Sequence, residues 1–271
     1  MNSLKNSSVL IIGCGWVGKK LGEHLSSNGA TVYGTTRSSS KFSDLSSLNI
    51  KPVKLELPTL KLSDIRLPKT DVVIISITPG RSGKRVEYPK SIGQISQVLA
   101  ESNVQVIMYS STSVYENSKD EVIETDAKPD KKSNNEITAA EGALLEHCED
   151  AVILRLCGLY GEDRHPVNFM AGRKNIGDGD SPVNLVHRDD VIQVTEKIIK
   201  KKIKGEIFNV CSGKHPARSE IYTKIADRLE LKKPTFTSGG SDGKLVSSEK
   251  LKKLLKISFL HPDPEDYLEG G

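Results

Sequence analysis

The chain has 271 residues, of which 36% are hydrophobic and 27% are charged, and its formal net charge is +4 at pH 7. This length is enough to bury a large core in one or two domains. The mild, dispersed positive charge does not support a nucleic-acid or membrane partner, and we interpret the local basic run 197–204 as the solvated end of a helix. We therefore expect a small-molecule substrate.

No targeting segment or metal centre is expected. Residues 1–8 are polar, and no apolar run approaches the length of a signal core or a membrane span. The six histidines are dispersed, and the four cysteines form no C-x-x-C pair, so we interpret the cysteines as small buried residues without disulfides. These features predict a cytoplasmic protein whose cysteines, Cys14, Cys148, Cys157 and Cys211, remain reduced.

The first predicted strand, residues 9–12, ends directly in a G-x-G-x-x-G pattern. The first glycine permits a tight turn, the second lets backbone N–H groups approach phosphates, and the third lets the next helix pack closely. The positive end of that helix would face the anion. The pattern predicts a dinucleotide site, and a purely structural turn is the alternative. The predicted contacts are Gly13, Cys14, Gly15, Trp16, Val17 and Gly18.

The second predicted strand, residues 31–35, leads to the position that selects between the two nicotinamide cofactors. A domain that selects NAD places an acid there for the ribose hydroxyls. This chain has Arg37 and Ser38 instead, which suit a 2′-phosphate. We predict NADP as the cofactor, with NAD as the alternative. A solvated basic loop is the other interpretation of these residues.

Strands and helices alternate through the first half of the chain. Apolar strands are predicted at 71–77, 104–110 and 151–156, with helices at about 88–102 and 134–148 between them. This alternation predicts an α/β fold of the Rossmann type, a doubly wound parallel sheet. Ligands bind at the carboxyl ends of such strands, where Ser76, Thr78 and Ser110 stand as further cofactor contacts.

The second half is less regular and predicts a small C-terminal substrate lobe. Helices are expected at 191–201, 219–229 and 248–255, and a strand at 205–210. We assign residues 1–162 to the cofactor-binding domain, with 184–212 returning to it. Residues 163–183 and 213–271 form the predicted lobe.

Four motifs extend over nearly the whole chain. They are the hydroxyl-rich segment 109–115, L-R-x-x-x-x-Y-G at 154–161, N-x-x-H-x-x-D within 183–190, and the strand and turn 207–213. Together they resemble the extended short-chain dehydrogenase/reductase family, the NAD-dependent epimerase/dehydratase group. The resemblance implies an oxidoreductase, epimerase or dehydratase that acts on a nucleotide sugar or a related small carbonyl compound, as a monomer or homodimer. It makes Ser111 the catalytic hydroxyl and Tyr160, Arg173 and His187 the substrate contacts.

The chain departs from the family at its acid/base pair, a tyrosine and lysine in Y-x-x-x-K. One register places Ser133 and Ile137 at these positions, and the alternative register offers Thr138 and Gly142. We expect Ser133, Ile137 and Glu141 to share one helical face. Because a serine hydroxyl cannot replace a lysine-activated phenol, the usual proton relay is not expected.

Two functions therefore follow from the sequence. One is an enzyme that uses Ser111 with another proton donor, and the other is a non-catalytic NADP(H)-binding sensor or regulatory protein. The pattern resembles an atypical subgroup of the family without the tyrosine. Tyr115 is interpreted as a packing residue, and Glu141 as a structural or helix-surface carboxylate rather than a general base.

Overall fold

The computed structural model describes residues 4–59, 61–80, 87–117, 121–161 and 164–266. Its central sheet has seven strands in the order β10-β7-β5-β4-β1-β2-β3. The neighbouring pairs β1–β2, β1–β4, β2–β3 and β4–β5 are parallel, which confirms the predicted doubly wound fold. The strands are β1 (Ser8–Ile12), β2 (Thr31–Thr36), β3 (Ile50–Lys54), β4 (Val72–Ile75), β5 (Gln105–Ser111), β7 (Val152–Leu156) and β10 (Ile207–Val210).

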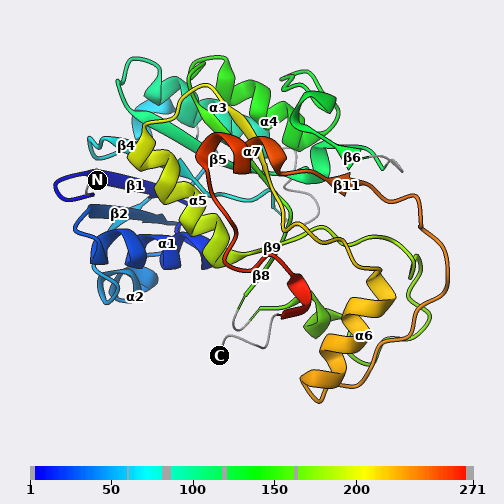
Figure 1. Ribbon diagram of the computed structural model, residues 1–271. Coiled ribbons are helices and arrows are strands. Elements are labelled where there is room, and N and C mark those ends of the chain that lie inside the picture. The colour runs from blue at the N-terminus through cyan, green and yellow to red at the C-terminus, as the bar shows by residue number, and fades with distance from the viewer. Residues whose placement is uncertain (1–3, 60, 81–86, 118–120, 162–163, 267–271) are drawn as a thin grey trace. The chain divides into compact units, whose positions relative to one another are not determined.

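Two compact units divide the chain. The first comprises Met1–Val114, Ala127–Arg155 and Ile192–Ile207, and the second comprises Tyr115–Asp126, Leu156–Val191 and Phe208–Gly271. The first unit holds β1 to β5 with helices α1 (Trp16–Ser27), α2 (Phe42–Ser46), α3 (Glu87–Leu99) and α4 (Glu136–Leu145), as Figure 1 shows. Helix α5 (Arg188–Lys201) begins in the second unit and continues into the first.

The second unit has its own small core. It contains the short strands β6 (Glu121–Val122), β8 (Gly158–Tyr160), β9 (Leu185–His187) and β11 (Leu245–Val246), which form the parallel pairs β6–β11 and β8–β9. Helices α6 (Arg218–Arg228) and α7 (Glu249–Leu255) also lie in it. The core packs Tyr160, Val167, Val183, Leu185, Ile221, Tyr222, Ile225 and Ala226.

Apolar runs identified the central strands well but missed the edge of the sheet. Every residue of β4 is buried, as expected for a strand covered on both faces. Strand β3 was not predicted, because its sequence, I-K-P-V-K, contains two lysines and a proline. Proline is tolerated there since, within the described ranges, β3 pairs with β2 alone and forms the edge of the sheet.

Helix α4 corrects the expectation about the acid/base position. Its side-chain N-cap is Asn135, whose Oδ1 accepts hydrogen bonds from the backbone N–H groups of Ile137 and Thr138. Ser133 therefore precedes the helix, in a turn closed by its N–H on the carbonyl of Asp130 at 3.0 Å. The prediction that Ser133 shares a helical face with Ile137 and Glu141 is wrong.

The expectation that every cysteine is unpaired is also wrong. Cys157 and Cys211 form a disulfide with a Cα–Cα distance of 5.2 Å, and both are buried. Each residue directly follows a strand, β7 or β10, and the N–H of Cys157 donates to the carbonyl of Val210 at 3.0 Å. Adjacent strand ends thus bring together two residues that lie 54 positions apart in the sequence. Cys14 and Cys148 are free thiols.

Among the described residues, no helix combines the length and the apolar character needed to cross a bilayer.

Candidate functional site

The loop between β1 and α1 has a backbone that only glycine adopts easily at its first position. Gly13 has φ +89°, and a Cβ there would lie 2.6 Å from Ile77 Cγ2 and 2.9 Å from the carbonyl carbon of Ser76. The loop is anchored to β2, since the N–H of Gly13 donates to Thr35 Oγ1 at 2.8 Å and the N–H of Cys14 donates to the Thr35 carbonyl at 3.0 Å. This confirms the predicted tight turn.

The other two glycines of the loop have different surroundings. A Cβ on Gly18 would lie 3.1 Å from both the Gly13 carbonyl oxygen and Ile11 Cγ2, so this glycine allows close packing of α1 on β1. A Cβ on Gly15 would meet its nearest atom, the Gly13 carbonyl oxygen, only at 3.9 Å. Gly15 is also the N-cap of α1 and has no side chain to cap it. The space beside the Gly15 Cα is therefore open to a phosphate group, while its N–H donates to the Gly13 carbonyl at 2.7 Å.

Two other side chains of the loop, those of Cys14 and Val17, are buried. A Cβ on Gly34 of β2 would lie 2.9 Å from Cys14 Sγ, so the thiol points into the protein. Burial raises the pKa of Cys14 to about 12, which keeps the thiol neutral at physiological pH. Cofactor contacts of the six loop residues stay a prediction.

The end of β2 presents a basic, hydroxyl-rich turn. Ser38 caps the short 3₁₀ helix Ser39–Lys41, because its Oγ accepts from the N–H of Ser40 at 3.3 Å. Arg37 is exposed and has no ion pair within the ranges that the structure describes. Its guanidinium is thus available to an added phosphate, and the predicted contact stays a prediction.

Two predicted contacts follow β4. The N–H of Ser76 donates to the carbonyl of Ile12 at 2.7 Å, so the pairing of β4 with β1 continues one residue beyond the strand. Thr78 is exposed two residues later. Both residues therefore lie at the carboxyl ends of the strands, the edge at which ligands bind to parallel sheets.

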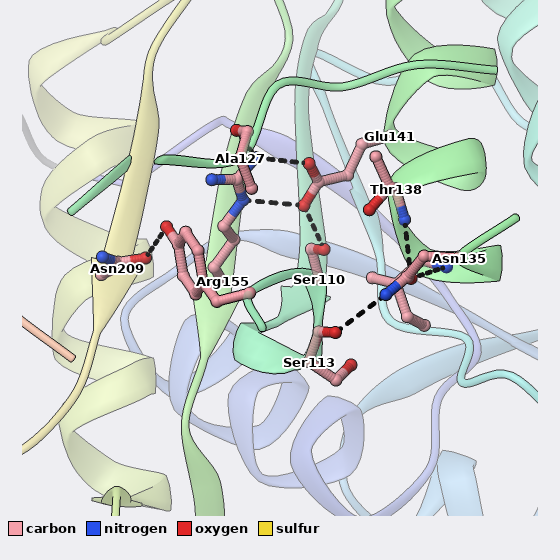
Figure 2. A network of polar contacts seen from close by, with 10 residues as sticks. Ser110, Ser113, Ala127, Asn135, Thr138, Glu141, Arg155 and Asn209 are labelled. Atoms are coloured by element: carbon pink, nitrogen blue, oxygen red, sulfur yellow. Dashed lines mark hydrogen bonds and ion pairs between the residues drawn. The ribbon is translucent and has the colours of Figure 1, made fainter. Parts of the chain in front are cut away.

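Ser110 is the first residue of a buried polar network at the end of β5 (Figure 2). Its Oγ donates to Glu141 Oε1 of α4. Arg155 of β7 donates from Nε to the same oxygen at 3.0 Å and from Nη2 to Glu141 Oε2 at 2.7 Å. The Nη2 group also donates to the Ala127 carbonyl at 2.8 Å. The Ser110 side chain therefore takes part in a buried structural network that links β5 to α4. Its contact with the cofactor stays a prediction.

Ser111, the predicted catalytic residue, is half-buried and faces its own turn. Its Oγ accepts hydrogen bonds from the N–H of Ser113 at 3.2 Å and from Ser113 Oγ at 3.0 Å. The turn is tied to α4, because Asn135 Nδ2 donates to the Ser113 carbonyl at 2.9 Å (Figure 2). With both contacts donated to it, the Ser111 hydroxyl keeps its proton for an external acceptor such as a substrate oxygen.

Neither expected register puts a tyrosine, a lysine or another proton-transferring group at the positions of the acid/base pair. Ile137 and Thr138 are both buried in α4. Gly142 packs tightly on the preceding loop, since a Cβ there would lie 2.2 Å from the N atom of Lys131. Glu141 is fully buried and paired, which confirms a structural carboxylate and excludes the helix-surface interpretation.

Tyr115 is a packing residue, as predicted. It is buried, and its hydroxyl donates to Asn209 Oδ1 at 2.7 Å within the second unit. The amide of Asn209 in turn donates from Nδ2 to the carbonyl of Ser247 at 3.0 Å. These bonds leave the Tyr115 phenol engaged in a buried structural contact.

The predicted substrate residues lie in the second unit and differ in exposure. Tyr160 is fully buried, with its ring 5.6 Å from His165 and 5.0 Å from His187 in edge-on contacts. His187 is also buried, whereas Arg173 is exposed. Substrate contact by these residues stays a prediction, and Arg173 is the one whose side chain solvent reaches freely.

Arg155 lies in the motif L-R-x-x-x-x-Y-G, which does not by itself predict the partner of this arginine. The available signal was a charged residue inside an otherwise apolar buried strand, together with a glutamate in a helix of alanines and leucines. Charges at such positions are rarely fully buried unless they are paired. The two residues could therefore have been assigned to each other.

Comparison with known proteins places this chain among cofactor-binding proteins. The family model described as "NAD(P)H-binding" matches residues 13–202. The chain is 33% identical to Protein YeeZ of Escherichia coli strain K12, over 94% of this chain and 97% of that protein. A nicotinamide dinucleotide is the cofactor class that the matched family binds.

Solved structures agree with the fold. An epimerase from Methanothermobacter thermautotrophicus has a TM-score of 0.79 at 19% identity and covers 99% of this chain and 91% of its own. MoeE5, solved in complex with UDP-glucose and NAD, has a TM-score of 0.78 at 18% identity and covers 97% of this chain and 96% of its own. At these identities the similarity establishes the shared Rossmann-type architecture.

Proposed function

Because this chain belongs to the NAD(P)H-binding family, we propose that it is a cytoplasmic NADP-dependent oxidoreductase, epimerase or dehydratase. Its substrate in this proposal is a nucleotide sugar or a related small carbonyl compound. The protein works as a monomer or a homodimer. When bound, the nicotinamide ring supplies a hydride donor or acceptor.

One observation carries the proposal, the state of the Ser111 hydroxyl. Because Ser113 donates both its N–H and its Oγ to Ser111, the Ser111 proton is directed to a group outside the turn. A substrate carbonyl or hydroxyl oxygen is the acceptor that such a donor would polarise. The buried Glu141–Arg155 pair and Asn135 hold the surrounding strand end and helix in place.

Exposed groups at the end of β2 support NADP over NAD. Arg37 offers a planar guanidinium, and Ser38 and Ser40 add hydroxyls in the same turn. No acidic side chain precedes Asp44 after the strand, so the ribose of NAD lacks its usual partner there.

A second function is favoured by the residues that replace the family's tyrosine and lysine. Ile137 is buried where a lysine would hold the nicotinamide ribose, and Glu141 is neutralised by Arg155. These substitutions fit a protein that binds NADP(H) and reports its presence without turnover. The two functions share the cofactor site and differ only in chemistry.

Oxidation of NADPH across a panel of nucleotide sugars and aldehydes tests the choice. For the enzyme we expect turnover that Ser111→Ala lowers by about 100-fold or more, since it removes a hydrogen-bond donor to the reacting oxygen. Ser47→Ala, on an exposed residue after α2, is the matched control and should leave the rate unchanged. Turnover unaffected by Ser111→Ala would reject the catalytic assignment. NADPH binding without turnover on any substrate would select the sensor.

A further inference from the structure

Two serine hydroxyls lie in series at the end of β5. Ser113 Oγ donates to Ser111 Oγ at 3.0 Å, and the N–H of Ser113 donates to the same oxygen at 3.2 Å. Ser111 is half-buried, whereas Ser113 is exposed. The two hydroxyls therefore form a hydrogen-bonded path from solvent to the predicted catalytic oxygen.

The backbone that carries the Ser113 hydroxyl is held at both of its polar groups. Its N–H is bound to Ser111, and its carbonyl accepts Asn135 Nδ2 at 2.9 Å (Figure 2). Asn135 is itself fixed, because its Oδ1 caps α4 and its N–H donates to Ser133 Oγ at 3.2 Å. With the backbone fixed, only rotation about the Cα–Cβ bond moves Ser113 Oγ away from Ser111.

The hydrogen bonds of this path run in one direction. A hydroxyl oxygen has two lone pairs, and Ser111 Oγ uses both of them for the two donors of Ser113. The proton of Ser111 is thus left for an acceptor outside the turn. When Ser111 gives up that proton, Ser113 Oγ is already placed to replace it. Because each hydroxyl receives a proton as it loses one, neither serine has to hold a charge.

The two tyrosines that flank this turn in the sequence are engaged elsewhere. Tyr109 is buried, and its hydroxyl lies 2.7 Å from Thr195 Oγ1. Burial also raises the pKa of Tyr109 above its ordinary value. The Tyr115 hydroxyl donates to Asn209 Oδ1 at 2.7 Å. Ser113, by contrast, contacts Ser111 directly.

We propose that Ser113 is a positioning residue that returns a solvent proton to Ser111 during turnover. This inference rests on the proposed function, in which Ser111 donates to the reacting oxygen of a carbonyl substrate. It supplies the proton source that the missing tyrosine and lysine leave open. That source lies on the turn at the end of β5 instead of on α4, and solvent water is its origin.

The transfer balances in protons and electrons when the substrate is reduced. The substrate carbonyl carbon accepts a hydride from the reduced nicotinamide, and the π electron pair of the C=O bond moves to the oxygen. That oxygen bonds to the Ser111 proton as the Ser111 O–H bond breaks, and Ser111 Oγ bonds to the proton that leaves Ser113 Oγ. Ser113 then takes a proton from water. One solvent proton is consumed for each hydride transferred, and both serines return to their starting state.

Single-turnover oxidation of bound NADPH isolates the chemical step and tests the relay. With a carbonyl substrate that the unchanged chain reduces, Ser113→Ala should slow this step at least about tenfold, because water replaces a positioned hydroxyl only in part. Ser113→Thr, which keeps a hydroxyl at this exposed position, should restore most of the rate. In mixtures of light and heavy water, the rate constant of the unchanged chain should fall along a curve, since more than one proton moves in the step.

Measurements without turnover separate a relay from a structural role. Ser113→Ala should bind NADPH with the same Kd as the unchanged chain in calorimetric titration, and should unfold at nearly the same urea concentration. Ser102→Ala is the matched control for the rate, since Ser102 is exposed and precedes β5 at its other end. Its single-turnover rate should equal that of the unchanged chain.

Two results would overturn the relay and leave the proposed function standing. One is a single-turnover rate of Ser113→Ala equal to that of the unchanged chain, and the other is a linear dependence of the rate on the heavy-water fraction. In both cases Ser111→Ala would still abolish most of the turnover. A chain that reduces no carbonyl substrate would instead reject the proposed enzyme and the relay together.

Discussion

Glu141 and Arg155 form a fully buried, bidentate ion pair in the first unit, with distances of 3.0 Å from Nε to Oε1 and 2.7 Å from Nη2 to Oε2. The pair joins α4 to β7, and Ser110 of β5 donates to the same carboxylate. Two charged side chains are tolerated in the protein interior only when they pair closely and their donors and acceptors are hydrogen-bonded. Three elements that surround the predicted catalytic turn are thus connected through one carboxylate.

Removal of one member of this pair should destabilise the protein strongly. Glu141→Gln leaves the Arg155 charge buried without its counter-ion, and we expect a loss of about 3–5 kcal/mol in the free energy of unfolding. Urea denaturation of the variant and the unchanged protein measures the difference. The double variant Glu141→Met with Arg155→Met should recover much of the loss, because it buries no charge.

The exposed pair Lys131–Glu146 is the matched control for this experiment. Lys131→Gln removes an ion pair that solvent already screens, so no measurable change in stability is expected. If Glu141→Gln proved as mild as this control, the pair would not be the structural link that we describe.

Gly13 and Gly15 should respond differently to alanine. Gly13→Ala forces a positive φ and a contact of 2.6 Å with Ile77, and should reduce stability by about 1–3 kcal/mol. Gly15→Ala places its Cβ in open space and should change stability by less than about 1 kcal/mol. It should nevertheless weaken NADPH binding at least about tenfold, since the methyl group blocks the approach of the phosphates.

Calorimetric titration measures the change in NADPH binding, and urea denaturation measures the change in stability. Full-strength NADPH binding by Gly15→Ala would contradict the assigned pyrophosphate position.

Arg37→Ala tests the cofactor preference. The variant loses a cation that would pair with the 2′-phosphate, so its Kd for NADPH should rise about tenfold or more while its Kd for NADH stays the same. Lys41→Ala, four residues later in the same exposed turn, is the control for general charge loss. Equal weakening for both cofactors, or none for NADPH, would remove NADP as the preferred cofactor.

His165 should make stability depend on pH. Burial lowers its pKa from 6.5 to about 4, so the folded protein holds the ring neutral while the unfolded chain takes up a proton near pH 6.5. Stability from this residue is complete above about pH 6.5 and is lost as the pH falls toward 4. Between pH 7 and pH 5 the loss is about 2 kcal/mol.

The variant His165→Asn checks this pH dependence. Asparagine can accept the Val167 N–H that His165 Nδ1 accepts at 3.1 Å, and it does not titrate. Urea denaturation at pH 7 and pH 5 should show a smaller decline for the variant. Parallel declines would mean that His165 is not the group responsible, and measurements between pH 7 and pH 8.5 serve as the reference range.

The cofactor end of the fold could be predicted because its signals are local. An apolar strand followed by G-x-G-x-x-G specifies a turn, a helix start and a close contact within ten residues, 9–18. Strand β3 and the small strands of the second unit were not predicted, since lysines, a proline and short lengths conceal their pattern. Pairing partners, not local propensity, stabilise such strands.

The sequence by itself determined the alternation of strands and helices, the glycine turn and the absence of the tyrosine and lysine. Each of these is a property of neighbouring residues. Only the tertiary structure decided that Glu141 pairs with Arg155, that Cys157 joins Cys211, and that His187 lies beside His261. Such contacts depend on which strand ends and segments the folded chain brings together. The number of residues between two positions does not determine how far apart they lie in the folded protein.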